Sequence, residues 1–154
     1  MKKIIIGLGN PILGDDSVGF HVTQQVEKRL NCEDKVEIDY LSLGGLCIME
    51  RLVGYDYAIL VDSINSKTLP IGTILSASLD QLPNPMIGHL NSSHDTSVQN
   101  ALQIGRSIGA QLPKHITIVG IEINPKYEFS EELTPLVAKS VPNMVNLILE
   151  LINY

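Results

Sequence analysis

The chain has 154 residues, a net charge of -6 at pH 7 and a pI near 5.1. This acidic balance argues against a nucleic-acid partner, because binding to phosphates generally requires a basic face. Hydrophobic residues make up 44% of the sequence and there are no long charge runs, which argues against wholesale disorder. The length suits one compact core, so we expect a single domain over residues 1–154.

The first residues and the cysteines indicate the compartment. The apolar run that starts at Ile4 stops at Gly7, so it is too short for a signal-peptide core or a membrane span. Cys32 and Cys47 have no Cys-x-x-Cys spacing, and two cysteines are too few for a disulfide framework. We interpret both as small buried residues in a reducing compartment. The sequence therefore predicts a soluble, cytoplasmic protein with no membrane partner.

Short apolar runs predict the strands of a sheet. Runs without polar interruption are typical of parallel strands that are buried on both faces. They occupy residues 3–8, 57–61 and 116–121, and residues 36–41 are also predicted to form a strand. A further run at 73–75 suits a strand nearer the edge of the sheet.

Apolar residues at helical spacing predict helices between and after these strands. The helices are expected to begin near Ser17, at Leu46, near Asp95 and at Glu131, with a break or kink in the last one at Pro142. Because strands and helices alternate through most of the chain, we expect an α/β fold. Its form would be a three-layer sandwich, a mostly parallel, twisted sheet with helices on both faces.

Carboxylate and imidazole groups occur where three segments reach the carboxyl edge of the predicted sheet. Asp15 and Asp16 follow the first strand, Asp62 ends the third, and His94 comes just before a helix. Ligands collect at this edge in doubly wound sheets. Two carboxylates and one imidazole would make a mixed oxygen and nitrogen site for a divalent ion such as nickel or zinc, with coordination positions left open.

Each of these residues also has a purely structural interpretation. Asp15 or Asp16 can cap the first helix, because carboxylates stabilise helix N-termini. Asp62 can be a turn residue that ends a strand, and His94 can belong to a helix-capping segment. His89 is close enough to His94 in sequence to be a second candidate ligand.

Motifs for other chemistries are missing or incomplete. There is no Gly-x-Ser-x-Gly elbow, and neither cysteine lies in a recognisable nucleophile motif. Gly7 and Gly9 begin a dinucleotide-like fingerprint, but Ile12 stands where its third glycine is needed. A nucleotide-binding domain with phosphate contacts at these glycines is therefore a weaker alternative.

Residues 7–19, GLGNPILGDDSVG, resemble the opening signature of hydrogenase maturation proteases. That signature is Gly-x-Gly-Asn, a short spacer, Asp followed by Asp or Glu, and then Gly. The resemblance continues at 61–63 (VDS), 93–95 (SHD) and 120–122 (GIE), so it covers essentially the whole chain. The first residues are also similar to peptidyl-tRNA hydrolase, but that family's Thr-Arg-His-Asn run does not follow, and the acidic charge disfavours tRNA.

The resemblance implies an endopeptidase that removes a short C-terminal extension from the large-subunit precursor of a [NiFe] hydrogenase after nickel has been inserted. The metal-contacting trio of the family falls on Asp16, Asp62 and His94, which would be the catalytic residues as well. Asp15 is a possible substitute, because the family often has the longer Glu at the position of Asp16. The nickel would be supplied by the precursor, so the isolated protein can lack it.

Two segments depart from the family pattern. Residues 41–45, LSLGG, replace an acidic Asp-Gly-Gly-Thr-like segment, which leaves open which hydrogenase is recognised. Ile123 stands where a proline is usual. The missing Ser or Cys nucleophile fits metal-assisted attack by water. The competing hypothesis is a nickel-dependent checkpoint or chaperone module that binds the same precursor without cutting it.

Overall fold

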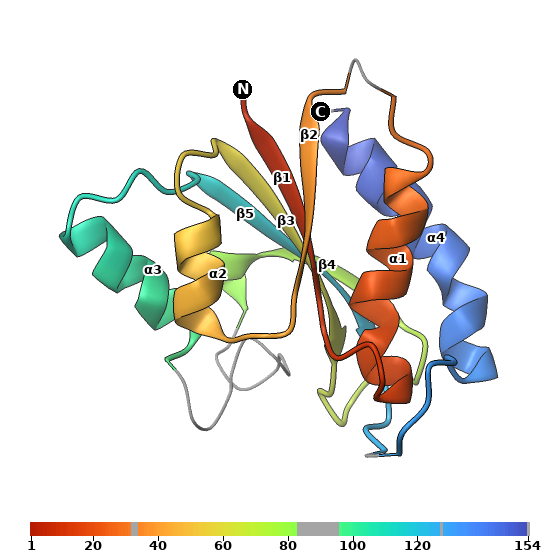
Figure 1. Cartoon of the computed structure of the whole chain (residues 1–154). Helices are drawn as coiled ribbons and strands as arrows, with labels where there is room; N and C mark the ends of the chain where they lie inside the picture. Colours follow the sequence, from red (N-terminus) through yellow and green to blue (C-terminus); the bar gives the residue numbers. More distant parts are fainter. Residues whose placement is uncertain (32–33, 83–95, 127, 154) are drawn as a thin grey trace.

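A five-stranded sheet lies at the centre of the computed structural model, which describes residues 1–31, 34–82, 96–126 and 128–153 (Figure 1). The strand order is β2-β1-β3-β5-β4, and all neighbours are parallel except β4, which is antiparallel to β5. The strands are β1 (Lys3–Leu8), β2 (Val36–Leu41), β3 (Tyr57–Ile64), β4 (Ile74–Ser78) and β5 (His115–Glu122). The mostly parallel sheet and the edge position of the 73–75 run are confirmed.

Helices cover both faces of this sheet, as predicted (Figure 1). One face carries α1 (Val18–Glu27) and α4 (Pro135–Ile152). The other carries α2 (Gly45–Arg51) and α3 (Val98–Ser107). Two short 3-10 helices complete the described elements, η1 (Gly14–Ser17) and η2 (Leu79–Gln81).

The two apolar cores follow from the alternation of side chains along the strands. On β1, Ile4 and Ile6 pack with α2 and α3, while Ile5 packs with α1 and α4. On β3, Leu60 and Val61 divide between the two cores in the same way. A strand that is apolar on both faces needs a cover on each, which explains the three layers.

The third strand is longer than its apolar run. β3 continues past Val61 through Asp62 and Ser63 to Ile64, where it still pairs with β5. Asp62 and Ser63 are buried within the strand. The interpretation of Asp62 as a strand-ending turn residue is therefore wrong.

Two further expectations need correction. The C-terminal helix begins at Pro135 and is not broken at Pro142, which lies inside α4. Cys47 has a free thiol but is only half-buried, whereas Cys32 lies outside the described residues.

By length and composition alone, α4 is the one helix among the described residues that could cross a membrane. Its buried side chains pack instead into the apolar core against α1 and the sheet. These side chains are Val137, Val141, Met144, Val145, Ile148 and Ile152. We therefore interpret α4 as a core helix of the domain.

Candidate functional site

The loop after β1 is shaped by glycine and holds Asp16 in place. Gly9 has φ 138°, and a Cβ atom at this position would lie 2.0 Å from the backbone oxygen of Asp16, so no other residue fits. The amide of the next residue, Asn10, donates a 3.0 Å hydrogen bond to Oδ2 of Asp16. The Gly-Asn pair of the opening motif thus orients the Asp16 carboxylate.

Close packing of α1 brings this loop onto the sheet. A Cβ atom on Gly19 would lie 2.1 Å from the backbone oxygen of Leu8 and 2.4 Å from that of Val61. A Cβ atom on Gly7 would lie 2.8 Å from the backbone oxygen of Gly19 and from Oγ1 of Thr23. The space around Gly7 is therefore filled by α1, which argues against the phosphate-binding alternative.

The two adjacent acids of the motif have different environments. Asp15 is buried, and its two carboxylate oxygens accept hydrogen bonds of 2.7 Å from the amide and the hydroxyl of Thr134, the N-cap residue of α4. Asp15 therefore caps a helix, but this helix is α4 and not the first one. Because Asp15 is buried whereas Asp16 is half-buried, Asp16 is the better candidate for binding a ligand.

Additional contacts tie the first loop to the segment that leads into α4. The amide of Gly14 donates to the backbone oxygen of Ser130 at 2.6 Å, and the amide of Ser130 donates to that of Ile12 at 3.0 Å. Nε2 of His21 lies 3.2 Å from the backbone oxygen of Glu131. Residues 12–16 and 130–134 therefore form one connected unit at the carboxyl edge of the sheet.

Ser63 links Asp16 to Asp62. Its hydroxyl donates a long hydrogen bond of 3.5 Å to Oδ1 of Asp16, and its amide donates one of 2.8 Å to Oδ1 of Asp62. Asp62 is fully buried, and a carboxylate in such a position must be stabilised by hydrogen bonds or a cation. Asp16 therefore lies against the residue that follows Asp62 near the end of β3.

The third predicted residue, His94, and the second candidate, His89, lie outside the described residues. The chain is described again from Thr96, which packs at the start of α2, where a Cβ atom on Gly45 would lie 2.1 Å from its backbone oxygen. Ser97 then caps α3 by accepting a hydrogen bond from the amide of Asn100. Over residues 1–31, 34–82, 96–126 and 128–153, no three His, Cys, Asp or Glu side chains are grouped to hold a metal ion.

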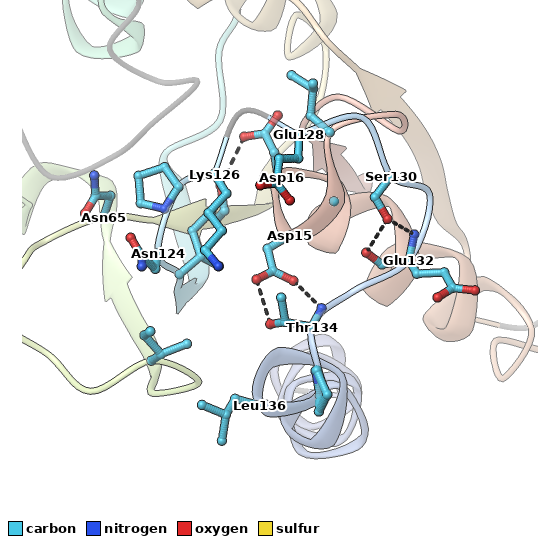
Figure 2. Close-up of a pocket in the computed structure, with 17 residues that line it drawn as sticks. Asp15, Asp16, Asn65, Asn124, Lys126, Glu128, Ser130, Glu132, Thr134 and Leu136 are labelled. Atoms are coloured by element: carbon cyan, nitrogen blue, oxygen red, sulfur yellow. Dashed lines mark hydrogen bonds between the residues drawn. The ribbon is translucent and has the colours of Figure 1, made fainter.

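A pocket of about 640 Å³ opens beside Asp16 and Ser63 (Figure 2). It is bounded by the first loop, the end of β3, the segments on either side of position 127, and the start of α4. Among the described residues its lining comprises Leu13, Gly14, Asp15, Asp16, Ser63, Asn65, Ile71, Ile123, Asn124, Pro125, Lys126, Glu128, Ser130, Glu132, Thr134, Pro135 and Leu136. Residues from distant parts of the sequence therefore share one cavity with the predicted ligand Asp16.

Glu122 has a structural role that the sequence analysis did not assign. This buried residue at the end of β5 accepts hydrogen bonds from the amides of Ser66, at 2.9 Å and 3.1 Å, and Lys67, at 3.2 Å. These contacts fix the loop after β3, which carries the pocket residue Asn65. The 120–122 motif was the available signal, but its partners are more than fifty positions away.

Comparison with known proteins identifies the family. The model of the hydrogenase maturation protease family matches residues 20–151, most of the chain. The protein belongs to the hydrogenase maturation protease family. As a member it is a protease of hydrogenase maturation, which confirms the resemblance seen in the opening motif.

Individual relatives support the assignment of the chain to this family. It is 28% identical over 137 residues to the hydrogenase 2 maturation protease of Escherichia coli (strain K12), covering 89% of this chain and 82% of that protein. The hydrogenase maturating endopeptidase HybD from E. coli superposes with a TM-score of 0.78 at 23% identity, covering 99% and 93% of the two chains. The [NiFe] hydrogenase maturation protease HybD from Thermococcus kodakarensis gives 0.73 at 20% identity, covering 98% and 99%. The two structural matches confirm the fold.

Proposed function

We propose that this protein removes the C-terminal extension of a [NiFe] hydrogenase large-subunit precursor after nickel insertion, and that it recognises the bound nickel through Asp16, Asp62 and His94. The nickel belongs to the precursor and is therefore part of the substrate. The observation that supports this best is the hydrogen bond from Ser63 to Asp16, which places Asp16 beside the residue that follows Asp62, next to a pocket large enough for a peptide segment.

The chemistry of the proposed ligands suits this task. Carboxylate oxygens with an imidazole nitrogen bind borderline divalent ions, and Asp16 lines the pocket, where an ion carried by a substrate can reach it. A set without thiolate should bind the free ion only modestly. Such weakness is useful, because an enzyme that loads itself with nickel would not distinguish filled from empty precursor.

Hydrolysis of the peptide bond requires a group that accepts a proton from the attacking water. Water adds to the carbonyl carbon, the C–N bond breaks, and the amine of the released extension takes up a proton. Nickel would supply Lewis acidity for this step or serve to dock the precursor. Asp16 is oriented by Asn10 and Ser63 toward the pocket, and we assign to it the acceptance of the proton from the attacking water.

The test is intact-mass analysis of a nickel-loaded precursor before and after incubation. The native protein should shorten the precursor by the mass of the extension, and should leave nickel-free precursor uncut. Asp16→Ala and His94→Ala should abolish cutting, while Glu131→Gln, whose side chain does not line the pocket, should not. Undiminished cutting by either alanine variant would refute the role of that residue.

The same experiment distinguishes proteolysis from the competing function. A nickel-dependent checkpoint or chaperone would form a complex with the nickel-loaded precursor but leave its mass unchanged. Binding without a mass change, with fully loaded and folded components, would favour that function over proteolysis.

A further inference from the structure

When a peptide bond is hydrolysed, negative charge develops on its carbonyl oxygen, and a hydrogen-bond donor held at that point lowers the barrier. We propose that the side-chain amide of Asn65 is this donor, and that Glu122 is the positioning residue that holds it in place. The inference rests on the proposed function and adds to it a catalytic group whose role differs from that of Asp16.

Few side chains around Asp16 can supply such a donor. Ionised acids only accept hydrogen bonds. Each hydroxyl among the described lining residues of the pocket already donates to another group of the protein, and these hydroxyls belong to Ser63, Ser130 and Thr134. The side-chain donors that remain in the described part of the lining are those of Asn65, Asn124 and Lys126.

Of these three donors, Asn65 is the one that the fold holds most closely. Asn124 and Lys126 are exposed, whereas Asn65 is half-buried and directly follows β3. A donor that is fixed before the reaction stabilises the developing charge better, because it need not be ordered during the step. In Figure 2, Asn65 lies on one side of Asp16 and Ser130 lies on the other, so Asn65 faces the reaction site from the side of β3.

Glu122 holds both ends of the loop after β3. Its carboxylate accepts hydrogen bonds from the backbone amides at the start of this loop, those of Ser66 and Lys67. Its backbone binds the end of the loop, accepting a 2.8 Å hydrogen bond from the amide of Gly72 and donating one of 2.9 Å to the oxygen of Thr73. A single residue at the end of β5 therefore closes the loop that begins with the proposed donor.

The burial of Glu122 makes the closed loop the favourable state. Glu122 is only 2% exposed, and a carboxylate in such a place is costly unless it is hydrogen-bonded. Opening the loop would remove its hydrogen bonds to the two amides. The loop is also bonded within itself, because the hydroxyl oxygen of Ser66 accepts hydrogen bonds of 3.2 Å from the amides of Thr68 and Leu69. The backbone that follows Asn65 is thus fixed before a substrate arrives.

Asn65 and Asp16 have complementary roles in the proposed step. The oxygen of water bonds to the carbonyl carbon while Asp16 accepts a proton from the water, and the π electrons of the carbonyl group move to its oxygen. The NH2 group of Asn65 donates a hydrogen bond to this oxyanion. When the C=O bond forms again, the C–N bond breaks and the leaving amine takes the proton from Asp16. Asn65 keeps its own protons throughout and acts only by stabilising the negative charge.

The role of Asn65 is tested by measuring kcat and KM for the cutting of nickel-loaded precursor. Asn65→Ala should lower kcat by a factor of about 100–1000 and change KM less than about threefold, because the contact is made to the transition state. Asn65→Asp, which keeps the shape but removes the donor, should lower kcat as much. Asn146→Ala, at an exposed position of α4 that does not line the pocket, is the matched control. A normal kcat in Asn65→Ala would overturn the inference.

The role of Glu122 is tested by coupling to Asn65. Glu122→Gln turns an NH2 group toward the amides of the loop and should lower kcat about tenfold. In the Asn65→Ala background it should cause no further fall, because the group that it positions is already missing. Ser66→Ala removes the acceptor within the loop without altering a buried charge, and should lower kcat about threefold in the native background alone. Equal falls in both backgrounds would show a general structural role and overturn the positioning.

Failure of the proposed function gives a different result. A native protein that leaves the mass of nickel-loaded precursor unchanged would overturn the proposed function and this inference with it. Cutting by the native protein and by Asn65→Ala at the same rate would overturn this inference alone.

Discussion

The carboxylate of Asp15 accepts two hydrogen bonds of 2.7 Å from Thr134, which is 119 positions further along the chain. This contact joins the loop after β1 to the start of α4 and forms one side of the pocket. Its neighbour Asp16 instead faces Asn10 and Ser63. The Asp-Asp pair of the opening motif therefore contains one buried acid that binds the start of α4 and one half-buried acid that lies beside Ser63 and lines the pocket.

Asp15→Asn should lower the free energy of unfolding. The oxygen of Asn can still accept from the amide of Thr134, but its NH2 group must donate to the hydroxyl, which then loses its own acceptor, and the charge that stabilises the start of α4 is lost. We expect a loss of about 1–2 kcal/mol in urea denaturation, because two hydrogen bonds to a charged group are weakened while the exposed Thr134 can pair with water. Asp80→Asn, at an exposed position, is the control. Equal stability of both variants would contradict the structural role of Asp15.

Asp16→Asn should instead lower the processing activity and leave the stability almost unchanged. Processing of nickel-loaded precursor should fall by a factor of about 100 or more, the contribution typical of a positioned acid or base. The free energy of unfolding should change by less than about 1 kcal/mol, because Asp16 is only half-buried. Mass analysis of the precursor over time and urea denaturation provide the two values. Full activity in this variant would show that another residue has the catalytic role.

Ser63→Ala tests the link between the two acids. The backbone amide still donates to Asp62, whereas the hydroxyl that contacts Asp16 is lost. The processing rate should fall about threefold to tenfold, which corresponds to one neutral hydrogen bond, and the change should appear in kcat with KM unaltered. Ser107→Ala, which removes a hydroxyl bonded within α3, should leave the rate unchanged. A normal kcat would show that Ser63 does not orient Asp16.

Gly19→Ala tests whether α1 needs its close approach to the sheet. The added Cβ would meet two backbone oxygens, of Leu8 and Val61, which a rigid sheet holds in place. A loss of more than about 3 kcal/mol is expected, beyond the usual range for overpacking. Gly105→Ala in α3 would meet the flexible side-chain ends of Met49 and Leu112 and should cost about 1 kcal/mol. Thermal unfolding of the two variants gives the comparison.

Much of the fold was predictable because it depends on local pattern. The strands predicted at 3–8 and 36–41 correspond to β1 and β2 residue for residue. The extension of β3 through Asp62 and Ser63 was not predictable, because polar residues normally end such a run. Their burial depends on contacts with β5 and Asp16, which are distant in sequence.

The continuity of α4 has an energetic explanation. A proline inside a helix costs about 3 kcal/mol, which is why a break or kink at Pro142 was expected. Its neighbours Val141, Met144 and Val145 are buried in the core, and each contributes about 1.5–3 kcal/mol by leaving water. A break at this point would expose them, so tertiary packing outweighs the local preference.

The candidate site was predictable in part. The rule that ligands gather at the carboxyl edge of a parallel sheet selected Asp15, Asp16, Asp62 and His94, and the family resemblance then favoured Asp16 over Asp15. The structure places Asp16 against Ser63, the residue after Asp62. The hydrogen bonds of Asp15 with Thr134 and of Glu122 with the loop after β3 join residues that are distant in sequence, so no local pattern predicts them. The pocket is assembled from segments near positions 14, 63, 71, 125 and 135, so only the folded chain defines it.

We propose that Asp16, Asp62 and His94 bind one nickel ion together. Anomalous X-ray diffraction from crystals of the protein soaked in a nickel salt can locate that ion. We expect one nickel peak within about 2–2.2 Å of a carboxylate oxygen of Asp16, one of Asp62 and a ring nitrogen of His94. A nickel peak that contacts none of the three, or that leaves Asp16 and Asp62 on separate sides of the edge, would contradict it.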